Sequence, residues 1–174
     1  MSKTLIAYQT LYSSTKQAAN TIAKTLRNNF NLKVDVFDIG KGKASLDLDD
    51  YDSVVIGSCI FDGRWASNAE NFLRNDFDGK QIALFVCSGY AGEADLYPQA
   101  YNAYLETLLE KHKKIKPVSM EAFGGRVPET KFPEVWSMQV QKKLSKFQKD
   151  NRSMGRIINW AQELGRIFTD GKAN

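Results

Sequence analysis

The chain has few of the residues and patterns on which several common kinds of site depend. Its 174 residues include two cysteines, Cys59 and Cys87, which are far apart and form no Cys-x-x-Cys pair. This spacing argues against a metal site and against a disulfide framework, and it fits a reducing compartment. The patterns Gly-x-x-x-x-Gly-Lys and Gly-x-Gly-x-x-Gly are both missing. We therefore expect neither a nucleoside-triphosphate loop nor a dinucleotide site.

Histidine and long apolar runs are also scarce. The single histidine, His112, stands among lysines at the end of a predicted helix, where a solvated helix C-terminus explains it better than catalysis. The longest apolar run, Ile82–Cys87, is far shorter than the roughly 20 residues of a membrane-spanning helix. The first residues, Met1–Thr4, lead into too short an apolar run for a signal peptide. We expect a cytoplasmic protein, and we name no catalytic residue.

The remaining composition is that of a globular protein. Apolar residues make up 43% and charged residues 25% of the chain, the formal net charge is +4, and the pI is about 9.0. A chain of this length suits one domain with a sizeable core. We therefore expect residues 1–174 to form a single domain. We expect no nucleic-acid partner, and the sequence leaves the oligomeric state open.

Buried-strand and helix patterns alternate along the chain. Short apolar runs predict strands at residues 5–8, 33–37, 53–57, 81–87 and 118–123. Helical spacing of apolar residues predicts helices after residue 15 and at residues 68–73, 95–112 and 153–168. This alternation indicates an α/β fold, a doubly wound parallel sheet with helices on both faces.

A hydroxyl-rich loop joins the first strand to the first helix. The loop points backbone N–H groups and the positive end of the helix toward one spot, which suits a phosphate monoester. A simple helix cap at Ser13 or Ser14 is the alternative, but one cap needs one hydroxyl and this loop has four. The candidate phosphate-binding residues are Thr10, Leu11, Tyr12, Ser13, Ser14 and Thr15.

Two further loops follow the third and fourth predicted strands, so they should converge on the same crevice at the carboxyl edge of the sheet. Glycines there let a backbone approach a ligand, and aromatic side chains can stack on a flat ring. The alternatives are an ordinary turn with Trp65 packed on a helix, and a loop ending in an Asp95 cap. The candidate contacts in the first loop are Ser58, Cys59, Ile60, Phe61, Asp62, Gly63 and Trp65. Those in the second are Ser88, Gly89, Tyr90, Gly92 and Tyr97. Cys59 is more simply a small apolar filler than a redox group.

The run Ile6–Ile22 resembles the phosphate signature of flavodoxins. Tyr8, Thr10, Thr15 and Ala19 match that signature, while Ser13 stands where the family has Gly, Ala or Cys. The resemblance implies a flavodoxin-like five-stranded sheet of order 2-1-3-4-5 and a non-covalently bound flavin mononucleotide (FMN). It places the isoalloxazine ring between the two further loops, with Asp62-Gly63 as the peptide that flips when the ring is protonated. Electron transfer through the flavin is the function that it implies.

The last third of the chain departs from a minimal flavodoxin. Residues 134–149 read as an extra basic helix within a loop-helix segment at about 124–150. Such a helix suits an anionic membrane surface, at the inner face of the membrane, or an acidic partner. A helix packed on the domain with a solvated lysine face is the alternative, and we favour it.

The segments Ile56–Ile60 and Phe123–Pro128, with the basic charge, resemble menaquinone-dependent protoporphyrinogen oxidases. That branch would make the chain an FMN-dependent oxidoreductase of heme biosynthesis. The partner would then be a quinone, whereas an electron carrier would use a redox partner protein.

Overall fold

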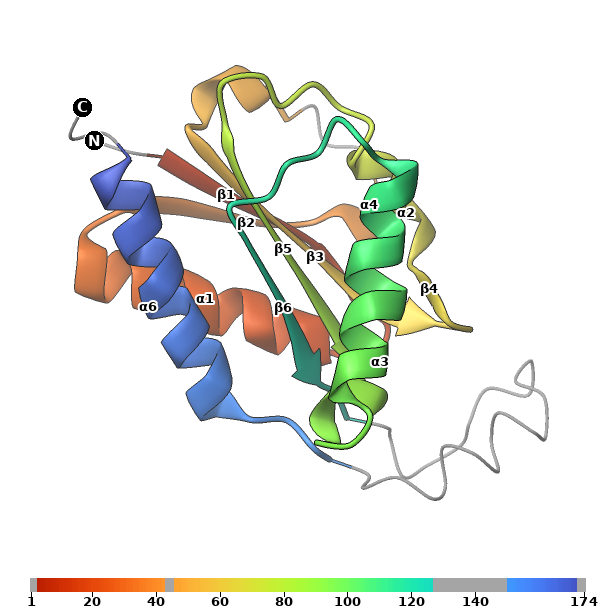
Figure 1. Cartoon of the computed structure of the whole chain (residues 1–174). Coiled ribbons are helices and arrows are strands. Elements are labelled where there is room, and N and C mark those ends of the chain that lie inside the picture. Colours follow the sequence, from red (N-terminus) through yellow and green to blue (C-terminus); the bar gives the residue numbers. More distant parts are fainter. Residues whose placement is uncertain (1–2, 43–45, 127–149, 172–174) are drawn as a thin grey trace.

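A five-stranded parallel sheet forms the centre of the molecule (Figure 1). The computed structural model describes residues 3–42, 46–126 and 150–171. The strands lie in the order β2-β1-β3-β5-β6, which is the predicted order 2-1-3-4-5 for the five parallel strands. The fold class predicted from the sequence is therefore confirmed. The parallel strands are β1 (Lys3–Gln9), β2 (Lys33–Asp38), β3 (Ser53–Phe61), β5 (Gln81–Ser88) and β6 (Ser119–Gly124).

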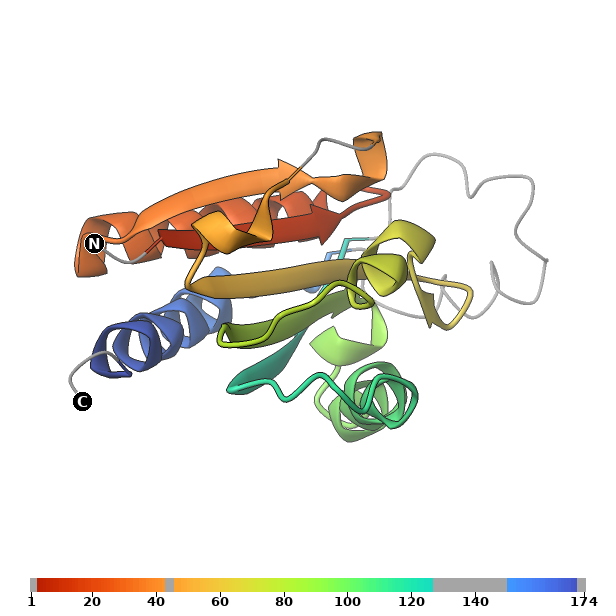
Figure 2. The ribbon, with the colours of Figure 1, turned by 90° about the horizontal axis from the view of Figure 1, so that it is seen from above.

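The helices form a layer on each face of the sheet (Figure 2). Two long helices cover one face, and they pack against each other closely enough that Gly165 leaves room for the Phe30 ring. Shorter helices and connecting turns cover the other face. The first layer is α1 (Ser14–Phe30) and α6 (Met154–Asp170). The second contains α2 (Ser67–Phe72), α3 (Tyr97–Tyr101), η4 (Asn102–Glu106) and α4 (Thr107–Lys111), with the turns η1 (Ile39–Lys41), η2 (Leu48–Asp50) and η3 (Tyr90–Gly92).

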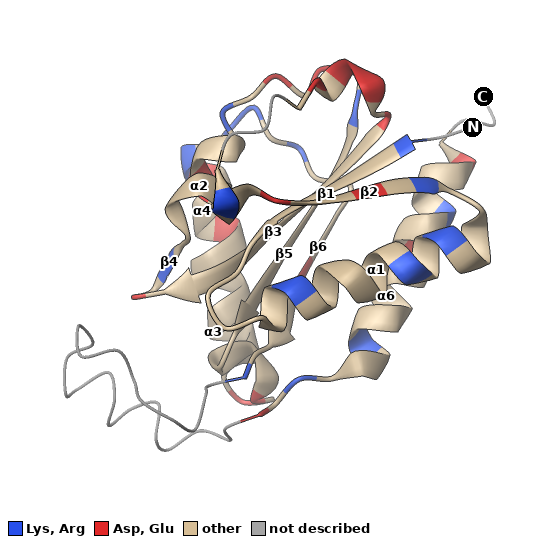
Figure 3. Cartoon of the chain, turned by 180° about the vertical axis from the view of Figure 1, so that it is seen from behind, with Lys and Arg blue, Asp and Glu red and all other residues tan. Residues whose placement is uncertain are grey.

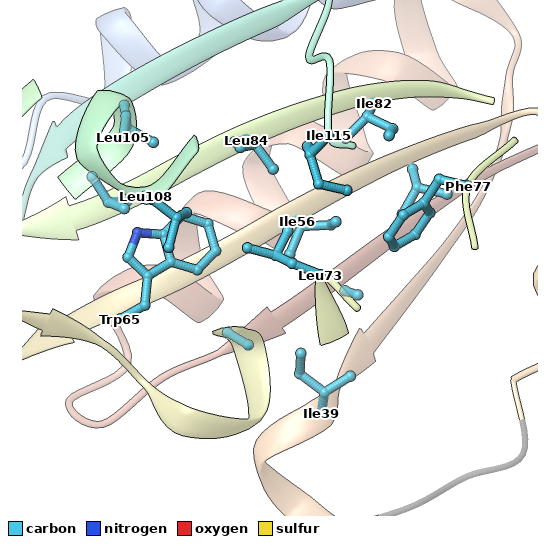
Figure 4. Close-up of a cluster of buried hydrophobic side chains, with 14 of the residues drawn as sticks. Ile39, Ile56, Trp65, Leu73, Phe77, Ile82, Leu84, Leu105, Leu108 and Ile115 are labelled. Carbon is cyan, nitrogen blue, oxygen red and sulfur yellow. The ribbon is translucent and has the colours of Figure 1, made fainter. Parts of the chain in front are cut away.

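Each face of the sheet has its own hydrophobic core, because the central strands are mostly apolar on both faces and are covered on both sides. Under α1 and α6 the core contains Ile6, Val55, Phe85 and Phe168, each fully buried or nearly so. Under the second layer it contains the residues drawn in Figure 4, such as Ile56 and Leu84. No helix of the described residues is long and apolar enough to cross a bilayer.

The element boundaries differ from the sequence-based expectation at two places. The predicted helix at 95–112 begins at Tyr97, with Pro98 in its first turn, and it contains a π-helical turn at Asn102–Glu106. Asp95 is not its cap, since Leu96 occupies that position. The stretch after residue 57 is not a loop: β3 continues to Phe61 and pairs with the short antiparallel strand β4 (Arg64–Trp65). The expected extra helix at 134–149 lies outside the described residues.

The hairpin of β3 and β4 forms because Asp62 and Gly63 accept a left-handed backbone. Their φ angles are 48° and 74°. Two such residues in a row make a type I′ turn, whose twist matches that of paired strands and which favours Asp-Gly. The sequence-based expectation of a turn at Asp62-Gly63 is confirmed, but the turn belongs to a hairpin at the carboxyl edge of the sheet.

Gly57 tests how tightly the central strands are packed. A Cβ at this position would lie 2.1 Å from the Phe85 ring. We expect Gly57→Ala to lower the free energy of unfolding by about 1–3 kcal/mol, because the buried ring must move from its packed position. The measurement is urea-induced unfolding. Gly155→Ala is the matched control, since nothing lies within 4 Å of the added methyl group there. Equal stability of Gly57→Ala and the unmodified protein would contradict this account.

Candidate functional site

The loop before α1 has the geometry of an anion site. Ser13 precedes the helix with a φ of 69°, and its side chain makes no capping hydrogen bond. The cap-only interpretation of Ser13 is therefore wrong. The first N–H groups of a helix have no partner within it, and α1 has no acidic residue in its first turn. Figure 3 shows that the charged residues along α1 are basic. An anion at this end would meet helix donors and no nearby carboxylate of α1.

Two hydroxyl groups of this loop are buried without a hydrogen-bond partner. They are Oγ1 of Thr10 and Oγ1 of Thr15, and the whole Thr15 side chain is inaccessible. Most buried polar atoms in folded proteins have a partner, so two unsatisfied hydroxyls on one loop call for a physical explanation. An anion seated on the loop would supply the acceptor that both lack.

Ser14 links this loop to the end of β6. Its Oγ accepts a hydrogen bond from the backbone N–H of Arg126, with an N···O distance of 2.9 Å. The hydroxyl hydrogen remains available to an acceptor, because the oxygen is used here as the acceptor. Arg126 was not among the residues selected from the sequence, although the Gly124-Gly125-Arg126 run directly after a strand was a signal that could have identified it.

The loop is bordered by exposed apolar side chains at the carboxyl edge of the sheet. Leu11 is 49% exposed, and Phe61, at the hairpin tip, is 39% exposed. Large exposed apolar side chains that gather beside a polar site can cover a ligand. Both were selected from the sequence. Leu11 follows the end of β1 and Phe61 is the last residue of β3, and these two strands are neighbours in the sheet. Tyr12 is half-buried, and burial raises the pKa of its hydroxyl.

Trp65 packs on a helix instead of facing the crevice. Its side chain is 5% exposed and belongs to the hydrophobic cluster that also contains Leu105 and Leu108 (Figure 4). Its indole N–H donates to the carbonyl oxygen of Tyr104 at 2.6 Å, within the π-helical turn. No open face of the ring remains for stacking, so the packing alternative is correct for this residue. Ser58 is also internal: its hydroxyl donates to the Cys59 carbonyl oxygen and accepts from the Ala66 N–H.

The second loop, after β5, is occupied in part by the protein itself. A Cβ at Gly92 would lie 2.1 Å from the Asn151 side chain, and one at Gly124 would lie 2.0 Å from the Asn151 carbonyl oxygen. The Asn151 amide donates to the Gly89 carbonyl oxygen at 2.6 Å. Gly92 is thus small to accommodate Asn151, and its expected contact with a ligand has no support. No local sequence signal identifies Asn151, because the glycines it fills lie on distant segments.

The other residues of this loop follow β5 at the carboxyl edge of the sheet. Ser88 is buried, and its Oγ accepts from the Ala91 N–H at 3.2 Å, which shapes the turn. Gly89 has open space around its Cα, and Tyr90 is half-buried. Tyr97 is less accessible to a ligand, because its hydroxyl donates to Glu121 at 2.7 Å and the Arg156 guanidinium lies 4.8 Å from its ring centre. Within the second loop, Gly89 and Tyr90 are therefore the better candidates.

A shallow hollow of about 410 Å³ also adjoins Ser13, on the outer face of α1. Its lining comes from α1 and Ser13 alone, so neither ring loop contributes to it. The convergence of three loops, and not this open surface, defines the candidate site. The residues that line the hollow are Ser13, Lys16, Gln17, Asn20, Thr21 and Lys24.

The segment that returns to the site is held by a charged cluster. Asp150 and Arg126 form an isolated antiparallel bridge, and Arg152 pairs with the Asp150 carboxylate and with Gln17 of α1. The Arg152 hydrogen bond lowers the pKa of Asp150 to about 2. This cluster sets the position of Asn151, which in turn shapes the loop after β5.

The Asp150 carboxyl should therefore titrate near pH 2 in the folded protein. Its folded pKa is lower than the unfolded value, so its contribution to stability is present above pH 4 and is lost as the pH falls from 4 toward 2. Carboxyl-carbon NMR titration measures this pKa directly. Arg152→Gln should raise it toward 3.8, whereas Arg166→Gln, on the far end of α6, should leave it unchanged. An Asp150 midpoint near 3.8 in the unmodified protein would contradict the pairing.

Solved structures with this fold include several flavodoxins. An archaeal flavodoxin superposes with a TM-score of 0.60 at 16% identity, covering 96% of this chain and 99% of the other. Flavodoxin 1 from Bacillus cereus gives 0.58 at 18% identity, covering 97% and 98%. Rubredoxin oxygen:oxidoreductase from Desulfovibrio gigas gives 0.59 at 15% identity. That superposition covers 99% of this chain but only 37% of the larger protein.

These likenesses establish the fold. No curated protein matches the chain at a significant level. Residues 5–154 match the family described as the flavodoxin domain. They include residues 10–15 before α1, which we call the phosphate-type loop, and the carboxyl ends of all five parallel strands. The chain belongs to the flavodoxin domain family.

Proposed function

We propose that the protein binds FMN without a covalent bond and transfers electrons between redox partners. The observation that supports this most is the pair of buried, unsatisfied hydroxyls of Thr10 and Thr15 at the start of α1. They fit a phosphate ester, since each can donate to an anionic oxygen and no acidic residue lies in the first helical turn. Membership of the flavodoxin domain family agrees with that ligand.

The phosphate would be held by hydroxyls and backbone N–H groups in place of a cation. Thr10, Ser14 and Thr15 would donate hydroxyl hydrogens, and the first turn of α1 would donate backbone N–H groups. Tyr12 and Ser13 complete this loop. Because none of the hydroxyl donors carries a charge, the grip would change little with pH once the phosphate is dianionic.

The ring would lie at the carboxyl edge, between the β3–β4 hairpin and the loop after β5. Leu11 and Phe61 would cover it from water, Tyr90 would stack on it, and Gly89 would let the backbone approach its edge. Cys59, Ile60 and the Asp62-Gly63 turn line the hairpin side. Bound FMN supplies one- and two-electron transfer, and the described residues of the crevice present no pair suited to general acid–base chemistry. The protein's part would be binding, orientation and exclusion of water.

A second function, oxidation of protoporphyrinogen with menaquinone as acceptor, is supported by where the long segment leaves the fold. Arg126 and Asp150, which flank residues 127–149, are bridged to each other, and the Arg126 N–H contacts Ser14 of the phosphate-type loop. Arg126 and Asp150 therefore lie beside the proposed flavin site, where a porphyrinogen would have to bind in order to reduce the flavin.

Changes at Thr10 test the phosphate site. We expect Thr10→Val to weaken FMN binding about 10- to 150-fold, the loss of one hydrogen bond of about 1.5–3 kcal/mol to a charged acceptor. Thr10→Asp should abolish retention, because a carboxylate would face the phosphate. The measurement is quenching of FMN fluorescence on titration. Asn20→Asp, which adds the same charge at an exposed position farther along α1, should retain binding. Unchanged affinity in both Thr10 variants would place the phosphate elsewhere.

Substitutions of Tyr90 and Trp65 should distinguish an aromatic side chain that stacks on the flavin from one that packs in the core. Tyr90→Ala is expected to weaken FMN binding by about 1 kcal/mol or more, since it removes the proposed stacking partner. Trp65→Phe is expected to lower stability by about 1 kcal/mol, through the hydrogen bond to Tyr104, and to leave FMN affinity nearly unchanged. Urea unfolding and FMN titration of both variants make the comparison. If Trp65→Phe weakened FMN binding and left stability unchanged, Trp65 would instead contact the flavin.

The choice between carrier and oxidase depends on turnover. If the second function holds, the FMN-loaded protein should oxidise protoporphyrinogen in the presence of a menaquinone analogue, followed by porphyrin fluorescence. Fast reduction of the bound FMN by a flavodoxin reductase or ferredoxin, without any porphyrinogen turnover, would exclude the oxidase and support the electron carrier. The control is the Thr10→Asp variant, which should be inactive in either assay.

A further inference from the structure

The chain's two cysteines lie side by side beneath the phosphate-type loop. In the sequence they are 28 residues apart, but the parallel register of β3 and β5 pairs Cys59 directly with Cys87. They are the last pair in that ladder, at the carboxyl edge of the sheet. Both belong to the face covered by α1: Cys87 packs in that core, and Cys59 is two residues beyond Gly57, which faces the Phe85 ring of the same core.

The backbone spacing permits a bond between them. Neighbouring strands lie about 4.8 Å apart, and disulfide-linked residues have Cα atoms about 4.4–6.8 Å apart. The usual Cβ separation in a disulfide, about 3.5–4.5 Å, is slightly shorter than the strand spacing. A bond here would therefore carry some strain, and strained disulfides are the more easily reduced ones. Both cysteines are free thiols in this structure.

The two thiols differ in exposure, which assigns their roles. Cys59 is half-buried and so can be reached by a small oxidant, whereas Cys87 is 5% exposed. Burial raises the pKa of the Cys87 thiol to about 12, and it raises the pKa of Cys59 as well. Because Cys59 is the more exposed of the two, it is the thiol that meets the oxidant, and Cys87 is the one that resolves the product. The raised pKa values keep both groups mainly as thiols at neutral pH, so the reaction with peroxide should be slow there.

Each thiol also neighbours one end of the phosphate-type loop. The backbone N–H of Leu11 opposes the burial effect on the Cys59 pKa, and the Thr15 hydroxyl opposes it on the Cys87 pKa. The contact with the Cys87 sulfur does not have hydrogen-bond geometry, so the Thr15 hydroxyl still lacks a hydrogen-bond partner. Both thiols therefore contact residues of the loop, and a ligand seated on the loop would restrict access to Cys59.

We propose that Cys59 and Cys87 form a reversible disulfide when a peroxide oxidises the protein, and that a bound phosphate ligand hinders this reaction. The Cys59 sulfur attacks one peroxide oxygen, an S–O bond forms, the O–O bond breaks, and water leaves with the thiol proton. The Cys87 sulfur then attacks the Cys59 sulfur, the S–S bond forms, the S–O bond breaks, and a second water leaves. One hydrogen peroxide thus takes two electrons from the two thiols. A dithiol reductant reverses the reaction.

The disulfide itself is tested on the full-length protein without FMN. Hydrogen peroxide should remove both free thiols together and yield a peptide pair cross-linked through Cys59 and Cys87 on non-reducing mass spectrometry, with full recovery after dithiothreitol. Cys59→Ser is the matched control and should leave Cys87 as a free thiol. Sulfinic acid at Cys59 with Cys87 still reduced, or cross-linked dimers in place of the internal bond, would overturn the proposal.

The hindrance by a bound ligand rests on the proposed function, so it is tested in a separate experiment. With FMN at about ten times its dissociation constant, disulfide formation should slow about tenfold, because only the free protein reacts. Equal rates at that occupancy would contradict the position of the thiols beneath the ligand. The two failures remain distinguishable: absence of FMN binding would remove the proposed function and leave the disulfide standing, whereas FMN binding without a disulfide would remove only the thiol pair.

Discussion

The beginning of α1 is the constraint on which the rest of this structure depends. A helix that starts without a side-chain cap, preceded by a left-handed Ser13 and bordered by two buried hydroxyls, has more donors than its own chain can satisfy. Such an arrangement costs stability in the free protein, since buried polar groups without partners are unfavourable. A ligand that accepts those hydrogen bonds offsets the cost, and a phosphate at the positive end of a helix is a chemically suited one.

The parallel sheet is what brings the other parts of the site to that helix. Because all five strands run in one direction, the loops after β1, β3 and β5 leave from the same edge, and β6 delivers Arg126 to Ser14. The protein also fills part of this edge by itself: Asn151 occupies the space at Gly92 and Gly124, and Trp65 anchors the hairpin to the π-helical turn. These contacts fix the loops before any ligand arrives, which lowers the entropy lost on binding.

The sequence was most informative where a local pattern determines structure. Apolar runs identified all five parallel strands, and the Asp62-Gly63 pair identified a turn, because strand burial and left-handed backbone both leave a signature in neighbouring residues. The hydroxyl-rich loop before α1 was recognised as a strand-to-helix connection for the same reason. Contacts between distant segments left no such signature. The packing of Trp65 depends on a carbonyl 39 residues away, and that of Gly92 depends on Asn151, so neither contact could be read from neighbouring residues. The pairing of Cys59 with Cys87 was likewise invisible until the strand register was known.

The most direct test of the central claim compares FMN with riboflavin, which has the same ring and no phosphate, in fluorescence titrations of the unmodified protein. If the hydroxyls of Thr10 and Thr15 hold the phosphate, the loss of two hydrogen bonds to a charged acceptor, each about 1.5–3 kcal/mol, should weaken riboflavin at least about 100-fold relative to FMN. Equal affinity for the two flavins would contradict the account, because the phosphate would then contribute nothing at the start of α1.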